Sequence, residues 1–364
     1  MGGSIYGNCF KITTWGESHG KALGVVIDGC PAGLSLCEED IQVFLDRRKP
    51  GQSKFTTARA ESDTVEILSG VFEGKTTGTP ISLMVKNKDN RSADYSEIAS
   101  YYRPGHADYT FDMKYGFRDY RGGGRSSGRE TIGRVAAGAI ASKILKELGI
   151  EILTYTKAIG NIDIKDYDFN KDQINDNDFY MPNNQAADKT REYLENVIRN
   201  NDSAGGVIEC IINGMMPGIG ETVFDKLDAE LAKSLMSIGA VKAVEIGDGI
   251  NVATTTGSQN NDAFTNNNGI SKLTNHSGGI LGGMSDGDKI VLRAYIKPTP
   301  SISESQNTVN KDGDEISINI KGRHDPIIVP RAVVVVESMA AITVLDMIIR
   351  NMSSKMDNII KLYN

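Results

Sequence analysis

Apolar residues recur at helical spacing in four segments of the chain, the pattern of helices that pack one face against a core. Each segment carries a boundary signal, such as a capping box, a glycine or a proline. The pattern predicts helices from the capping box at 35–38 to Pro50, from 129 to 148 before Gly149, from the N-cap Asp225 to Ile238, and over 331–352.

Alternation typical of strands covers residues 5–29, where two strands flank a turn, and also 64–86 and 240–246. Residues 161–203 are rich in Asp, Asn and Lys, which indicates a surface insertion. The Asn-rich residues 254–277 indicate a mobile loop. The sequence has no convincing repeat and no linker clean enough to divide it, so we expect one domain over 1–364, although the length allows two.

Composition narrows the class of protein. The 364 residues are 39% hydrophobic and 24% charged, as in ordinary globular proteins, and the net charge of −7 argues against general affinity for nucleic acid or anionic membranes. The most apolar segment, 333–349, is interrupted by Glu337 and Asp346, so we expect a buried helix there and not a membrane span. The four cysteines lack metal-ligand spacing, and no targeting segment is visible. We therefore expect a cytoplasmic protein with reduced cysteines.

One stretch, 118–134, concentrates candidate chemistry. It holds five arginines and the triplet Gly122–Gly124, and it leads into the second predicted helix. Glycines allow close backbone approach, a helix N-terminus attracts anions, and arginine forks suit phosphate or carboxylate. A solvated surface loop and an RGG-type nucleic-acid segment are the alternatives. RGG segments are repeated and poor in apolar residues, and this one occurs once beside a patterned helix.

All four histidines lie in turns rich in Gly or Pro: His19, His106, His276 and His324. Core histidines would be spread over apolar faces, so this distribution favours a site. No pair of histidines has metal-ligand spacing, and we expect no metal.

Six motifs, spread in order over nearly the whole chain, resemble those of the chorismate synthase family. They are Gly16-Glu17-Ser18-His19-Gly20, Arg103-Pro104-Gly105-His106-Ala107-Asp108, the Arg-Gly loop at 121–127, Gly239 to Gly247, Asn275-His276 with its glycines, and Gly322-Arg323-His324-Asp325-Pro326. Small departures occur at Gly128, Gly239 and Lys54, where the family commonly has alanine, asparagine and arginine.

The resemblance implies an α+β fold, with helices sandwiched between antiparallel sheets, and a homotetramer. It implies the conversion of 5-enolpyruvylshikimate 3-phosphate to chorismate, a 1,4-elimination of phosphate that requires reduced FMN without net redox change. The flavin reductase could be external. A flavin oxidoreductase with net hydride transfer and an RNA-binding protein are the other hypotheses, and the acidic net charge opposes the second.

The resemblance also implies roles for individual residues. His19 would be the acid that protonates the leaving phosphate, His106 would protonate or polarise the reduced flavin, and Asp325 would be the base near flavin N5. Substrate contacts would come from Ser18, Arg48, Arg103, Ser127, Arg129 and Arg323. FMN contacts would come from Arg125, Ser126, Ser127, Gly239, Ala240, Gly282, Lys297, Pro298, Thr299, Pro300, Ser301 and Arg323. The suggested NADP contacts are Arg48 and Lys54.

Overall fold

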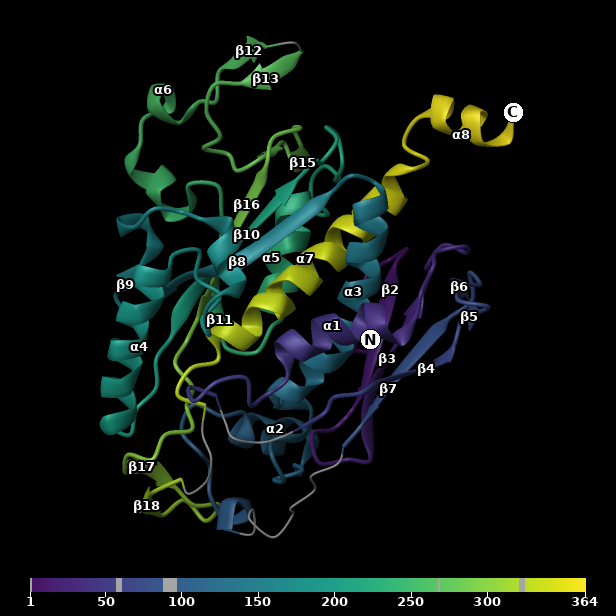
Figure 1. Cartoon of the computed structure of the whole chain (residues 1–364). Helices are drawn as coiled ribbons and strands as arrows, with labels where there is room; N and C mark the ends of the chain where they lie inside the picture. Colours follow the sequence, from purple (N-terminus) through teal and green to yellow (C-terminus); the bar gives the residue numbers. More distant parts are fainter. Residues whose placement is uncertain (1, 57–60, 88–96, 268, 321–324) are drawn as a thin grey trace.

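Two five-stranded antiparallel sheets enclose a layer of helices in the computed structural model, which describes residues 2–56, 61–87, 97–267, 269–320 and 325–364 (Figure 1). The first sheet has the order β1-β2-β3-β7-β4, with β1 Ile5–Tyr6, β2 Lys11–Gly16, β3 Ala22–Asp28, β7 Ile81–Lys86 and β4 Val65–Ser69. The second has the order β11-β16-β10-β8-β9, with β11 Val241–Ile246, β16 Ile290–Ile296, β10 Gly206–Asn213, β8 Glu151–Ile159 and β9 Ile162–Asp163.

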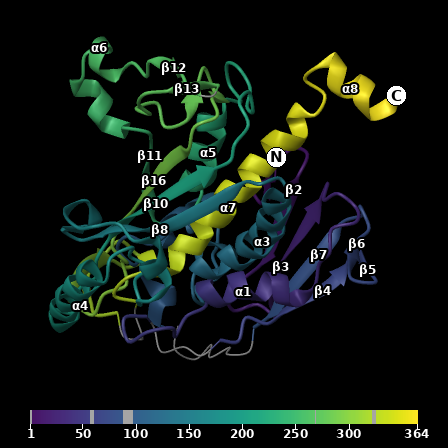
Figure 2. The ribbon, with the colours of Figure 1, turned by 45° about the horizontal axis from the view of Figure 1, so that its top comes forward.

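Four helices lie against these sheets: α1 Glu38–Arg48, α3 Thr131–Glu147, α5 Leu227–Met236 and α7 Val329–Asn351. Helix α3 contacts the first sheet and α7 contacts the second, and the two helices pack on each other, as the two views show (Figure 2). At their crossing a Cβ on Gly138 would lie 2.2 Å from Cβ of Ser338, so the backbones approach closely because Gly138 has no side chain.

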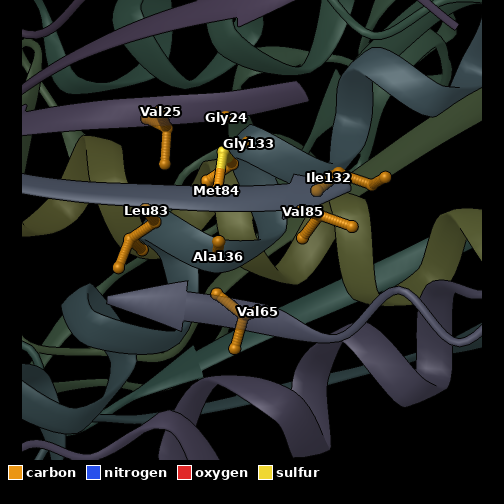
Figure 3. A pocket seen from close by; sticks show the side chains of 9 residues that line it. All are labelled: Gly24, Val25, Val65, Leu83, Met84, Val85, Ile132, Gly133 and Ala136. Atoms are coloured by element: carbon orange, nitrogen blue, oxygen red, sulfur yellow. The ribbon is translucent and has the colours of Figure 1, made fainter. Parts of the chain in front are cut away.

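Close approach also governs the contact between α3 and the first sheet. A Cβ on Gly133 would meet the carbonyl oxygen of Gly24 at 3.0 Å, so a larger residue would push the helix away from β3. Figure 3 shows the side chains gathered at this contact from β3, β4, β7 and α3: Gly24, Val25, Val65, Leu83, Met84, Val85, Ile132, Gly133 and Ala136.

Helix α7 is the central element of the core, since every residue from Val333 to Met347 is buried. It is long and apolar enough to cross a membrane, but 83% of its most apolar window is covered by the rest of the fold, as predicted for a core helix. Its buried charges have partners. Glu337 pairs with Arg47 at 2.7 Å, and Asp346 accepts hydrogen bonds from three backbone N–H groups of residues 8–10.

Shorter elements complete the described part of the chain. They are β5 Val71–Phe72, β6 Lys75–Thr76, α2 Asp108–Tyr115, α4 Asn184–Arg199, α6 Gly257–Asn260, β12 Phe264–Asn266, β13 Ile270–Lys272, β14 Ile280–Leu281, β15 Met284–Ser285, β17 Gln306–Val309, β18 Glu315–Ile318 and α8 Met356–Tyr363.

Several boundaries differ from those predicted. Cys37, not Ser35, is the N-cap of α1, because Ser35 is drawn into a β-bridge with Lys75. Helix α5 begins after Lys226, because the carboxylate of Asp225 pairs with Arg350 at 2.8 Å and does not cap. The central helix is confirmed, but a 3₁₀ turn at Gly128–Glu130 precedes it.

The two polar segments are more ordered in structure than predicted. The expected surface insertion contains α4, whose buried Ala186, Ala187 and Leu194 pack on the main core. The expected mobile loop contains α6 and the hairpin of β12 and β13. Asn and Asp side chains in these segments accept backbone hydrogen bonds in turns and at helix N-caps, so their abundance does not indicate disorder.

Candidate active site

The turn between β2 and β3 meets the Arg-Gly loop, so two motifs about a hundred residues apart become neighbours. Ser18 Oγ lies 3.0 Å from His19 Nδ1 and donates to the carbonyl oxygen of Gly122 at 3.2 Å. A Cβ on Gly122 would lie 2.1 Å from Cε1 of His19. Gly122 has a φ of +62° and is therefore needed both for its backbone conformation and for room beside the imidazole.

Three of the arginines in the 118–134 stretch bind neighbouring parts of the chain. Arg118 pairs with Asp112 at 2.7 Å, and Arg121 pairs with Asp119 at 2.8 Å. Arg125, a predicted FMN contact, donates to Thr14 Oγ1 at 2.7 Å and to the Gly16 carbonyl at 3.1 Å. The guanidinium of Arg125 thus holds β2 beside the loop, a structural role that the sequence did not indicate.

The serines of the loop also have local partners. Ser126 Oγ donates to the Gly123 carbonyl at 2.8 Å, and Ser127 Oγ accepts from the backbone N–H of Arg129 at 3.4 Å. Ser127 is therefore the N-cap of the 3₁₀ turn that leads into α3. These bonds fix the approach to the helix and place Arg129 at its start.

Arg129 lies in a buried charge cluster with Arg48. The two guanidiniums share the carboxylate of Asp63, with Arg48 Nη2 at 2.5 Å from Oδ2 and Arg129 Nη1 at 3.1 Å from Oδ1. Arg129 also contacts Glu61 and donates to Asn87 Oδ1 at 2.7 Å. The Nε of Arg48 is buried without a hydrogen-bond partner among the described residues, so this cluster has capacity for a further acceptor.

Arg103, another predicted substrate residue, makes a bidentate pair with Asp108, both N–O distances being 2.8 Å. Burial acts to raise the pKa of Asp108, but the hydrogen bonds and charge of Arg103 outweigh it, and the pKa lies below its usual value. This pair holds the turn that carries His106.

The structure brings His106 together with the loop after β16. His106 Nδ1 lies 3.0 Å from the Pro104 carbonyl and Nε2 lies 3.3 Å from Ser301 Oγ, while Lys297 Nζ donates to the Gly105 carbonyl at 2.9 Å. Burial and then the charge of Arg103 lower the pKa of His106 to about 4. The neutral ring therefore donates from Nδ1 to Pro104 and accepts at Nε2 from Ser301.

Gly239, Ala240 and the loop after β16 are neighbours as well. The Lys297 N–H donates to the Ala240 carbonyl at 3.0 Å, and it is Ala240, not Gly239, that takes a positive φ, of +73°. His106, Gly239, Ala240 and residues 297–301 together form what we call the His106 edge of the site. A cavity of about 470 Å³ adjoins it and is lined in part by Lys242, Tyr295, Lys297 and Pro298.

This edge has the features that a phosphorylated planar cofactor needs. The hydroxyl of Thr299 is buried without a partner among the described residues, so it is an available donor. Lys297 supplies a cation and Ala240 a close backbone turn. The donor set and the orphaned hydroxyl therefore fit FMN.

Asp325 connects to the arginine cluster through Arg331, a residue that the sequence analysis did not select. Arg331 Nη1 donates to Asp325 Oδ2 at 2.6 Å, and its Nε donates to the Arg48 carbonyl at 3.1 Å. Asp63 and Arg331 were both missed. A buried arginine requires a carboxylate partner, and the acidic residues of segment 61–63 were the available signal for Asp63.

Further hydrogen bonds connect the Asp325 loop to the loop at the His106 edge. The Ala204 N–H donates to the Pro326 carbonyl at 2.9 Å, and Ser203 Oγ donates to the Thr299 carbonyl at 2.7 Å. The loop that carries Asp325 is therefore tied to the loop that contacts His106.

Other predicted residues are not brought to this region. Lys54 is exposed and pairs with Glu195 at 2.7 Å. Gly282 lies in the hairpin of β14 and β15, at the opposite end of the molecule from α2, which follows His106 directly (Figure 1). Arg323 lies outside the described residues, as does His324. Within the described ranges there is no cluster of His, Cys, Asp and Glu suited to a metal ion.

Comparison with known proteins agrees with the motifs. The family model described as chorismate synthase matches residues 10–349. The chorismate synthase of Agathobacter rectalis is 66% identical over 364 residues, covering 100% of this chain and 99% of its own. The chorismate synthase of Methanococcoides burtonii is 55% identical, covering 96% and 97%.

A crystal structure of a chorismate synthase is 30% identical, covers 98% of this chain and 97% of its own, and has a TM-score of 0.78. This likeness, with the two antiparallel sheets around their helices, confirms the α+β fold expected from the resemblance. The chain belongs to the chorismate synthase family.

Proposed function

We propose that the region from the His19 turn through the arginine cluster to the His106 edge is the active site of a chorismate synthase. The activity is that of a carbon–oxygen lyase, which converts 5-enolpyruvylshikimate 3-phosphate to chorismate with loss of phosphate. The observation that carries the proposal is that contacts between distant segments bring the candidate residues into one region. His19 lies against the loop that leads to Arg129, and Asp63 joins Arg129 to Arg48. Arg331 joins Arg48 to Asp325, whose loop is tied to the His106 edge.

The charge cluster suits the substrate, which has two carboxylates and a phosphate. Arg129 and Arg48 would bind two of these groups, with Ser18, Ser127, Arg103 and Arg323 as further contacts. A guanidinium binds a carboxylate or phosphate through paired N–H donors, and Arg48 has an unused buried Nε. Asp63 balances the two cations before the substrate arrives, since two adjacent buried guanidiniums without an anion would be costly.

The histidines and Asp325 would manage protons. His19 would protonate the leaving phosphate, and Ser18 beside its Nδ1 would orient the ring. Asp325 would accept the proton that the substrate loses from C6. His106 has a pKa of about 4, so in the ligand-free protein it is neutral, and it would serve by hydrogen bonding until a nearby anion raised its pKa.

FMN would be held mainly at the His106 edge, by Gly239, Ala240 and residues 297–301. Ser126, Ser127, Arg125 and Arg323 would be further contacts. Gly282 would contact this FMN only from another copy of the chain, because its hairpin lies at the opposite end of the molecule from α2 (Figure 1). When bound, reduced FMN would supply electron density to the substrate and regain it, so the reaction has no net redox change. The chain's own part is to position the two groups and to exclude water.

Further properties expected from the resemblance are proposals as well. We place Arg48 and Lys54 as NADP contacts, and expect a homotetramer, a cytoplasmic location, an external flavin reductase and one domain over the chain. Membership in a lyase family does not favour the alternative of net hydride transfer.

The decisive experiment is phosphate release under anaerobic conditions with photoreduced FMN, with oxidised FMN and without flavin. We expect many turnovers with reduced FMN, none in the other two arms, and flavin that is still reduced when the substrate is exhausted. Equal activity with oxidised FMN would make the flavin structural. One flavin oxidised for each phosphate released would make the enzyme an oxidoreductase.

A further inference from the structure

A guanidinium stands at an unfavourable place in helix α7. Arg331 lies in the first turn, where the helix dipole favours anions, and that turn contains no acidic residue. Its side chain exposes only 18% of its surface. An arginine in such a place needs specific partners, and the fold supplies two.

The two partners belong to different parts of the proposed site. Asp325 Oδ2 accepts from Arg331 Nη1 at 2.6 Å, and the Arg48 carbonyl in the last turn of α1 accepts from Arg331 Nε at 3.1 Å. One planar side chain therefore sets the position of the Asp325 carboxylate relative to the helix end that carries Arg48.

Three charged groups act on Arg331: Asp325, Arg48 and Asp63. Burial lowers the pKa of Arg331 and the charge of Arg48 lowers it further, whereas Asp325 and Asp63 act in the opposite direction. Arginine remains charged in proteins despite such effects. The carboxylate of Asp325 thus has a fixed cation beside it.

We propose that Arg331 is a positioning residue for the reaction: it orients Asp325 and joins it to the end of α1 that carries Arg48. The inference rests on the proposed role of Asp325 as the base. A base that abstracts a proton from carbon must lie within hydrogen-bond reach of that proton, and the contact with Arg331 helps to set the position of the carboxylate.

The test compares Arg331→Met and Arg331→Lys with a matched control, Arg350→Met. Arg350 lies at the other end of α7, exposes the same 18% of its side chain, and pairs with Asp225 at 2.8 Å. The measurements are kcat and KM for phosphate release against pH with reduced FMN, substrate binding by calorimetry, and thermal unfolding.

We expect Arg331→Met to lower kcat by about 100-fold, the usual effect of a misplacement near 1 Å, with a smaller change in substrate affinity. Arg331→Lys should recover part of kcat, since its ammonium group can still donate a hydrogen bond to the Asp325 carboxylate. Arg350→Met should lower only the unfolding temperature.

Three results would overturn the proposal. The first is a kcat in Arg331→Met equal to that of the parent. The second is the same change in Arg350→Met, which would show a general effect of weakening α7. The third is full activity in Asp325→Asn, which would remove the base itself. Only the third result contradicts the proposed function. The first two contradict the positioning role of Arg331 and leave the proposed function intact.

Discussion

Replacing Gly122 by alanine displaces the candidate acid, His19, without replacing any ionisable residue. The new Cβ would lie 2.1 Å from Cε1 and 2.3 Å from Nδ1 of His19, whereas ordinary contacts begin at 3.4 Å. The imidazole must therefore retreat by more than 1 Å. That movement breaks the 3.0 Å contact between His19 Nδ1 and Ser18 Oγ.

The expected effect has two parts. Alanine at a φ of +62° costs roughly 1–2 kcal/mol of folding stability, the usual penalty for a left-handed residue with a side chain. The displaced ring should cost about 100-fold in turnover, which corresponds to roughly 3 kcal/mol in the barrier. The loss should therefore be larger in kcat than in stability.

Gly123→Ala is the matched control. Gly123 also has a positive φ, of +81°, but its Cβ would lie no closer than 3.2 Å to a neighbour, Ser126 Oγ, and 3.9 Å from the backbone N of Ser127. Both variants should unfold at similarly lowered temperatures, and only Gly122→Ala should lose turnover when phosphate release is measured at saturating substrate and reduced FMN. Turnover of Gly122→Ala within about threefold of the control would refute the assignment of His19 to the reaction.

Two further outcomes are expected. Arg129→Ala should weaken substrate binding, measured by calorimetry, by about 2–5 kcal/mol, because it leaves a buried charge of the substrate unpaired. An unchanged affinity with unchanged circular dichroism would show that neither substrate binding nor the fold requires Arg129. His106 has a pKa of about 4, below that of an unfolded histidine, so its contribution to stability is full above about pH 6.5 and falls as the pH drops toward 4. The free energy of unfolding, measured in urea, should fall less in His106→Gln than in the parent between pH 7 and pH 4.5, by up to roughly 3 kcal/mol. An equal fall in the two proteins would contradict the burial of the imidazole.

The sequence predicted the elements that have a strong period or a strong boundary. The helix at 331–352 is predominantly apolar over its whole length, and the structure begins and ends it within two residues of the prediction. Helix α8 was missed because it is short and none of its residues is buried. The cap of α1 was misplaced because a tertiary bridge, invisible in local sequence, takes Ser35.

For the site, the loops could be predicted but not the partners within them. Glycines beside His19 and His106 indicated positions near a ligand. The structure places His19 against Gly122 and His106 beside Ser301. The sequence could not show that Arg125 binds β2 and not a ligand. A guanidinium uses the same N–H donors for carbonyl oxygens and for phosphate. Residue type alone does not say which acceptor the fold will present.

The crossing of α3 and α7 has a consequence beyond packing. Arg129 precedes α3, and Arg331 stands in the first turn of α7, so the separation of the two helices at their crossing affects how far apart these two arginines stand. Gly138 and Ser338 therefore act as a spacer of minimal thickness. A methyl group added at Gly138 would force the two helices apart at this crossing and move the two arginines with them. In the proposed site, the spacing of Arg129 and Arg331 would thus depend on a glycine buried deep in the core.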